Sequence, residues 1–464
     1  MFHDHRVQAT NQIKEENTLS IIFHSALNKG RELVKEKGDL KCWNGEASRL
    51  YVRKAQYHWG WDWGTFLHFC FIFRNSPPSK QLLTGLGPRI MTCGPWKPIS
   101  LEIYKSRISD LHFPVHLSED LTSATVSYTI NLDSAPSDST VRVALYKPQT
   151  KSTGKGLKDK TTLVYSETIP AETTVQGTFT VENPKLWYPY QYGSQPLYEL
   201  VVELYHEDVL LDTQTKRLAF RQVKLIQRPL NNDHPESESE EGTTFFFEIN
   251  NIPIFAAGAN WIPASIFLTR LTSQNYRSLL TIFLNGGMSL LRIWGGGIYE
   301  AETLYDQADE LGILLWQDFM FACGQYPAND TGWLNSVKRE TETQVRRLKW
   351  HPSIVLYAGN NEDYQLAEAE GLGWDPRDRG DPEKWLKGGF PGRYVYEKVL
   401  PEVVTKWVPG VGYHPGSPWG GDGANDPKVG DIHQWNGTSS HPSPHLLSFI
   451  LLPLLAHRSH VFLL

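Results

Sequence analysis

Residues 354–363 read IVLYAGNNED, an apolar run that ends in a glycine and then presents two amides and two carboxylates. A short continuous apolar run with such a boundary is typical of a strand buried on both faces of a sheet. Polar side chains directly after a buried strand are costly unless they are hydrogen-bonded or functional. The stretch therefore predicts a parallel sheet whose strand ends carry a polar site.

Strands and helices alternate on both sides of this stretch. We expect helices at 273–284, 302–311, 334–350 and 393–404, between strands at 254–257, 290–293, 313–316 and 354–358 and one near Val411. This alternation predicts βαβ units and a parallel sheet. A closed (β/α)8 barrel needs eight units. Residues 229–440 are therefore expected to form only the first half of a TIM barrel.

The upstream sequence predicts two all-β domains. In residues 1–105, short alternating runs at 17–24, 50–54 and 99–104 suggest a sandwich. Residues 106–228 predict an immunoglobulin-like sandwich, from Thr/Val/Tyr-rich runs at 124–132, 140–146, 197–205 and 215–223. The overall expectation is a multidomain β plus α/β chain.

Two stretches do not fit these domains. Residues 65–87 interrupt the first sandwich with an apolar run and a Pro-Pro turn, and 441–464 end the chain with another apolar run. The apolar core of the second is about half of the ~20 residues that cross a membrane. We interpret both as gene-model or splicing products.

Composition limits the classes of function. The formal net charge of -6 argues against a nucleic-acid partner. Four cysteines without a CxxC pair, and no histidine at metal-ligand spacing, predict neither a disulfide framework nor a metal site. Because the N-terminus lacks a signal-peptide core, we expect a reducing, cytoplasmic location without membrane contact. No cofactor is expected.

Glu362 is the strongest candidate for chemistry. Active sites of (β/α) barrels lie at the C-terminal ends of the strands, and glycosidic cleavage needs a carboxylic acid that protonates the leaving oxygen. We choose Glu362 over Asp363 because glutamate reaches further and directly follows Asn360 and Asn361. The alternative is a helix N-terminus, where Asn, Asp and Glu are common.

Other strand ends offer similar side chains. Asn260 and Trp261 end the first strand, Trp294 follows Arg292 before three glycines, and Asp318 ends the third strand. Such convergence predicts one polar, aromatic-lined pocket suited to a sugar. In the first domain, the WGWDWG stretch places Trp61, Asp62 and Trp63 together, either as a packed turn or as a loop that reaches the pocket. Sequence alone slightly favours packing.

The motifs WGWDWG, GANWIPA, RIWGGGIYE, WQDFMFAC and HPSIVLYAGNNED, in this order, resemble the β-mannosidases of glycoside hydrolase family 2. VENPKLWYPYQYGSQPLYEL and GDIHQWN are most similar to the intracellular fungal type. The resemblance covers about residues 10–64 and 88–436. It implies a jelly-roll sandwich, an immunoglobulin-like sandwich and a catalytic barrel, with retaining removal of terminal β-D-mannose from manno-oligosaccharides and N-glycan core fragments.

The resemblance also implies roles for residues. Glu362 would be the proton donor, Asn361 would contact the region of the sugar 2-hydroxyl, and Trp294 would form a pocket wall. Trp61, Asp62 and Trp63 would form a mannose-binding loop, which changes the interpretation of that stretch from packing to binding.

A retaining enzyme needs a second carboxylate roughly 5–5.5 Å from the first, and no residue here matches the family's nucleophile. We therefore expect this chain not to turn over substrate. Two alternatives stay open: a non-catalytic carbohydrate-binding remnant, and another family 2 activity such as a β-galactosidase or β-glucuronidase. A homodimer is also left open.

Overall fold

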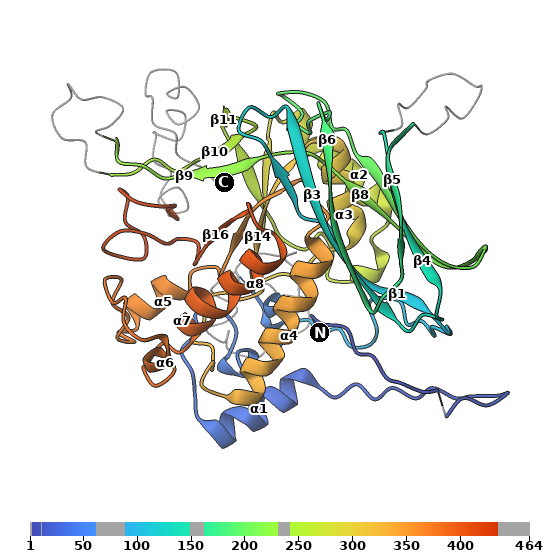
Figure 1. Ribbon diagram of the computed structural model, residues 1–464. Helices are drawn as coiled ribbons and strands as arrows, with labels where there is room; N and C mark the ends of the chain where they lie inside the picture. Colours follow the sequence, from blue (N-terminus) through green and yellow to red (C-terminus); the bar gives the residue numbers. More distant parts are fainter. Residues whose placement is uncertain (1, 11, 62–88, 149–161, 231–241, 435–464) are drawn as a thin grey trace.

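The computed structural model describes residues 2–10, 12–61, 89–148, 162–230 and 242–434. Figure 1 shows a β-rich sandwich beside a second sheet that is flanked by helices. The predicted insert at 65–87 and the predicted tail at 441–464 both lie outside the described residues.

The parallel sheet carries the strand ends singled out above. In the described chain it has five strands in the order β12-β13-β14-β15-β16. They are β12 (Gly258–Trp261), β13 (Leu290–Ile293), β14 (Leu314–Asp318), β15 (Ile354–Ala358) and β16 (Gly412–His414). Every residue of β13, β14 and β15 is buried, which explains why these strands are continuous apolar runs. The strands predicted at 290–293 and 354–358 are confirmed, whereas the first strand begins at Gly258 rather than at residue 254.

Side chains alternate between the two faces of this sheet, as the pleat of a strand requires. Leu291, Ile293 and Leu315 pack in the core that includes the helices. Leu290, Leu314 and Trp316 pack on the other face, against a small antiparallel sheet. That sheet has the order β11-β10-β9 and consists of β9 (Val223–Ile226), β10 (Phe246–Ile249) and β11 (Ile252–Ile254).

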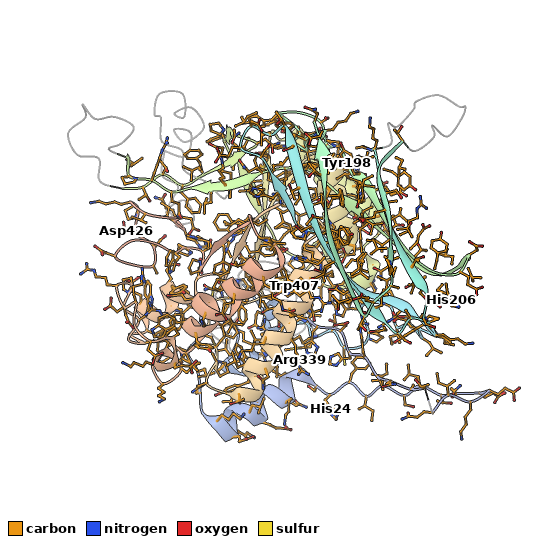
Figure 2. The ribbon with its side chains drawn as sticks, viewed as in Figure 1. His24, Tyr198, His206, Arg339, Trp407 and Asp426 are labelled. Atoms are coloured by element: carbon orange, nitrogen blue, oxygen red, sulfur yellow. The ribbon has the colours of Figure 1, made fainter. Side chains whose placement is uncertain are left out.

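The helices follow the strands in the expected order. They are α2 (Ser273–Asn285), α3 (Glu302–Leu311), α4 (Thr331–Leu348), α5 (Asp363–Ala369), α6 (Pro382–Trp385), α7 (Gly392–Tyr394) and α8 (Leu400–Trp407). The helix predicted at 302–311 is confirmed. α4 begins earlier than predicted because Asp330 caps it, accepting from the Trp333 amide at 2.9 Å. Trp407 ends α8 close to α4 (Figure 2), and the Arg346 guanidinium lies 4.9 Å from the centre of its ring.

Two antiparallel sheets form the sandwich. One has the order β1-β3-β2 with β6 also paired to β3, and the other has the order β5-β4-β7-β8. Alternate side chains of both sheets fill one core, as a sandwich requires. Figure 2 labels Tyr198 and His206 at the two ends of β7. The strands are β1 (Arg107–His112), β2 (Val115–Leu117), β3 (Ser123–Asp133), β4 (Ser139–Tyr146), β5 (Leu163–Pro170), β6 (Thr174–Glu182), β7 (Tyr198–His206) and β8 (Val209–Leu218).

The strands predicted in residues 1–105 are wrong. In the described part of that range, the structure has the helix α1 (Ala26–Lys37) and short 3-10 turns, and the first strand begins at Arg107. The segments at 17–24 and 99–104 have the composition of strands but pair with no neighbouring strand among the described residues. Ile22 and Ile103 are consequently 80% and 83% exposed. These segments line a hollow of about 3100 Å³ that also borders β1, β8 and α3.

Among the described residues, no helix combines the length and the apolar character that are needed to cross a bilayer.

Candidate active site

The C-terminal ends of the parallel strands meet at one edge of the sheet. The register aligns Trp261 with Ile293, Ile293 with Gln317, and Asp318 with Ala358. Isolated bridges extend this alignment beyond the strands, since Asn361 pairs with both Ala322 and Ser417. The loops after β14, β15 and β16 are thus held together at the level of Asn361 and Glu362.

Glu362 lies at this edge, with its side chain only 12% exposed. Its Oε1 is 2.8 Å from Nδ1 of His433, and its Oε2 accepts from the Cys323 thiol at 3.3 Å. It occupies the N-cap position of α5, yet its side chain makes no capping hydrogen bond. Asn360 supplies the cap instead, because its Oδ1 accepts from the Asp363 amide at 3.0 Å. The helix-cap interpretation therefore does not account for the Glu362 carboxyl.

The backbone at Glu362 has a φ of 65°, in the left-handed region that non-glycine residues rarely adopt. Cys323, which contacts the same carboxyl, has a φ of 49°. Each such residue costs of order 1–3 kcal/mol, and such residues cluster at functional sites. The surrounding loops keep both residues in this conformation, and the two side chains meet as a result.

The environment of Glu362 favours its ionised form. Burial alone would raise the pKa of the Glu362 carboxyl, but the hydrogen bond and charge of His433, with smaller effects from Cys323 and Arg292, hold that pKa below its ordinary value. Asp363 differs: burial raises the pKa of its carboxyl to about 8. Its oxygens accept from the Gly324 amide and the Tyr396 hydroxyl. Asp363 is thus a structural group of the loops, and Glu362 is the accessible acid.

Asn361 belongs to a buried polar cluster at the strand ends. Its Oδ1 accepts from Nη2 of Arg292 at 2.9 Å, and its Nδ2 lies 3.5 Å from the Cys323 sulfur. Arg292 also forms a buried ion pair with Asp318 at 2.7 Å. The Asp318 oxygens accept in addition from the Trp316 indole and the Gly295 amide. This geometry gives Asp318 the role of holding Arg292, and its predicted contact with a sugar stays a prediction.

The two tryptophans predicted to bind sugar lie side by side. The ring centres of Trp61 and Trp294 are 4.9 Å apart in an edge-to-face arrangement, and both residues are buried. The Arg49 guanidinium lies 5.3 Å from the Trp61 ring centre and donates to the carbonyls of Ala322 and Cys323. Trp61, in the described part of the WGWDWG stretch, therefore lies beside the strand ends. Asp62 and Trp63 lie outside the described residues.

The two residues at the end of β12 have different partners. Asn260 faces the cluster, because its Oδ1 is 3.2 Å from Nη1 of Arg292. Trp261 donates instead to Glu300 at 2.9 Å, and the Tyr276 hydroxyl donates to the same carboxyl at 2.9 Å. Burial raises the pKa of Glu300 despite these two donors. Trp261 is thus directed toward Glu300, a residue to which the sequence assigned no role.

His433 and Cys323 were not predicted as site residues from the sequence. Both stand inside motifs quoted for the resemblance, GDIHQWN and WQDFMFAC. Apart from this position inside a motif, the sequence held no signal for either residue, because each is far along the chain from the Glu362 carboxyl that it contacts.

A second polar cluster lies away from this edge. Asp306, Asp309 and His351 bring possible ligand atoms within 4.8 Å of one another. Arg217 of β8 pairs with both aspartates, so a positive charge is already present there. The cluster joins the sandwich to α3 through these ion pairs.

Comparisons with known proteins agree with this geometry. Residues 1–97 match the family described as "Glycosyl hydrolase 2 galactose-binding domain-like", and residues 106–221 match "Glycosyl hydrolases family 2". Both matches are to domains of glycosyl hydrolase family 2. The chain is also 44% identical over 94% of its length to β-mannosidase B of Thermothelomyces thermophilus, and 42% identical over 94% to β-mannosidase B of Emericella nidulans.

The solved structure of a β-D-mannosidase from Dictyoglomus thermophilum matches 88% of this chain, with 33% identity and a TM-score of 0.64. The resemblance to family 2 β-mannosidases is therefore confirmed. The chain covers 46% and 47% of the two fungal relatives and 44% of the bacterial chain, so it spans about half the length of the proteins that it matches.

Proposed function

We propose that this sequence belongs to a β-mannosidase that removes terminal, non-reducing β-D-mannose from oligosaccharides by a retaining mechanism. The observation that carries the proposal is the position of Glu362 at the C-terminal edge of the parallel sheet, beside Asn361. Glu362 is the proton donor, Asn361 and Asn260 contact sugar hydroxyls, and Trp61 with Trp294 forms an apolar wall. The finer architecture, a jelly-roll domain, an immunoglobulin-like domain and a (β/α)8 barrel, belongs to the same proposal.

The ionised state of Glu362 fits half of a two-carboxylate site. A general acid needs a pKa near the working pH, and a second carboxylate nearby raises the pKa of the first because like charges disfavour ionisation. Among the described residues, no second carboxylate bonds to Glu362, whereas the His433 imidazole does and lowers the pKa of the Glu362 carboxyl. Without the nucleophile, Glu362 therefore has the lowered pKa described above.

We expect the purified 464-residue chain to release no nitrophenol from p-nitrophenyl β-mannoside, because no residue of the chain matches the nucleophile. Measurable release from this substrate, lost in E362Q, would contradict that expectation.

Azide gives a sharper test of the acid. A small external anion can attack the anomeric carbon where the nucleophile is absent. A C–N bond then forms while the glycosidic C–O bond breaks, and the leaving oxygen takes the proton of Glu362. We expect α-mannosyl azide from mannobiose, detected by NMR, with a rate that falls about 10²–10⁴-fold in E362Q, because a sugar oxygen leaves slowly unless it is protonated.

The matched control is E370Q, an exposed carboxylate at the C-terminal end of α5, which should leave the azide rate unchanged. Faster azide reactions with the corresponding β-galactoside or β-glucuronide would assign a different family 2 activity. Binding of mannobiose in calorimetry without any azide product would favour the carbohydrate-binding alternative.

The cytoplasmic location remains part of the proposal. It is supported by Cys42, Cys93 and Cys323, the described cysteines, which are all free.

A further inference from the structure

A continuous chain of buried hydrogen bonds ends on Glu362. Ser417 Oγ donates to Oδ2 of Asp431 at 2.7 Å and lies 2.9 Å from Nε2 of His433. His433 Nδ1 then lies 2.8 Å from Oε1 of Glu362. Ser417 is fully buried, and His433 and Glu362 are each 12% exposed, so little water competes with these contacts.

The positions of the hydrogens in this series of hydrogen bonds follow from Asp431, at the end opposite Glu362. Burial alone would raise the pKa of Asp431, but His414, His433 and Ser417 hold it below its ordinary value, so Asp431 is ionised. A carboxylate only accepts, and the Ser417 hydroxyl must therefore give its hydrogen to Asp431. The lone pair that remains on Ser417 accepts from Nε2–H of His433.

This assignment determines the protonation of the contact between His433 Nδ1 and Glu362 Oε1. With a hydrogen on Nε2, the neutral ring has a bare Nδ1. A bare nitrogen and a carboxylate oxygen at 2.8 Å would be two acceptors facing each other, which is repulsive. One additional proton must lie between them, either on Nδ1 of a charged ring or on the Glu362 carboxyl.

We propose that His433 is a positioning residue that shares one proton with Glu362, its ring held in place by Ser417 and Asp431. Its role in catalysis rests on the proposed function: the shared proton is the one that Glu362 delivers to the leaving oxygen. The carboxylate left behind faces a bare nitrogen, and it regains a proton from the attacking water in the second step.

Other groups face the same carboxyl. The Cys323 thiol, on the loop after β14, donates to Oε2, and burial keeps its pKa well above the ordinary value, so it remains protonated. Arg292 of β13 contributes a weaker positive field. His414 of β16 acts on Asp431 rather than on Glu362, with 2.8 Å between its Nε2 and Oδ1 of Asp431. His433 is therefore the group whose removal should change the Glu362 titration most.

The experiment is a pH titration of the Glu362 carboxyl carbon by ¹³C NMR in the 464-residue chain, with the signal assigned by its loss in E362Q. In H433Q the pKa of Glu362 should rise by about 1 or more, the size expected for loss of a charged partner. H414Q serves as the matched control, because it removes a buried imidazole from the same network without touching Glu362, and its shift should be much smaller. An identical Glu362 titration in wild type and H433Q would overturn the proposal.

S417A provides a second variant if H433Q does not fold, which circular dichroism would reveal. It removes only the hydroxyl that holds the ring, and the pKa of Glu362 should again rise, by less than in H433Q. No rise in a folded S417A would then overturn the proposal. These titrations need no substrate, so a failed azide reaction with a shifted titration would reject the mannosidase and keep the shared proton.

Discussion

At the scale of single residues, neighbouring carboxyls have opposite properties because their partners differ. Glu362 faces an imidazole and a thiol, whereas Asp363 is fully buried against Gly324 and Tyr396. The sequence identified Glu362 from reach and position after a buried strand. It did not identify His433, because the two residues are 71 positions apart and only the fold brings them together.

The buried ion pair between Arg292 and Asp318 should contribute strongly to stability. R292A leaves Asp318 as an unpaired buried charge and removes a donor from Asn361, so the free energy of unfolding should fall by about 3–5 kcal/mol. Urea denaturation followed by circular dichroism measures this change.

The control for Arg292 is R377A. Arg377 also pairs with an aspartate, Asp422, but both side chains are about three-quarters exposed, at 76% and 74%. An exposed pair contributes about 0–1 kcal/mol, so R377A should cost little. Equal losses in the two variants would show that burial of the Arg292 pair contributes nothing.

At the scale of elements, the site depends on three loops that follow β14, β15 and β16. Gly359 allows the end of β15 to approach the loop after β16, because a Cβ at this position would lie 2.0 Å from the Pro415 carbonyl oxygen. The backbone contacts beyond Gly359 then join Asn361 to Ser417 and set the distance between Glu362 and His433.

G359A should therefore destabilise the protein by about 1–3 kcal/mol, as overpacking usually does, and separate Glu362 from His433. Thermal unfolding measures the first effect, and the carboxyl titration measures the second. G388A is the control, since a Cβ there meets only Trp385 O at an ordinary 3.5 Å. A G359A protein as stable as G388A would contradict this account of the loop contact.

Elements were predictable where burial determines the pattern. β13 and β15 are buried on both faces, and their apolar runs gave correct boundaries. The segments at 17–24 and 99–104 alternate apolar and polar residues as a strand does, but a strand also requires a hydrogen-bonded partner, and the local sequence pattern does not supply one. β5 was missed for a different reason, because it is mostly exposed and lacks a strong apolar pattern.

At the scale of the whole molecule, the sandwich is joined to the helical side of the parallel sheet by charges. Arg217 of β8 pairs with Asp306 and Glu310 of α3, and His351 pairs with Asp309 and Glu302. Burial alone would lower the pKa of His351, but the two carboxylates outweigh it and raise the pKa to about 9.

This cluster makes stability depend on pH. The pKa of His351 is about 9 in the fold and about 6.5 in an unfolded chain, so its charge stabilises the fold fully below pH ~6.5. The contribution is lost as the pH rises through about 9. The Tm of the wild type should therefore fall between these values more steeply than the Tm of H351Q.

H116Q is the matched control, because His116 lies exposed on β2. Its Tm should follow the wild type across the same pH range. Parallel Tm curves for the wild type and H351Q would mean that His351 does not link protonation to folding.

The uncovered apolar segments near Ile22 and Ile103 have a practical consequence for anyone who prepares this chain. Chaperones and the fluorescent dye ANS bind exposed hydrophobic side chains on extended backbone. The purified protein should therefore increase ANS fluorescence and still unfold cooperatively on heating. Chaperones of the Hsp70 type are expected to co-purify with it.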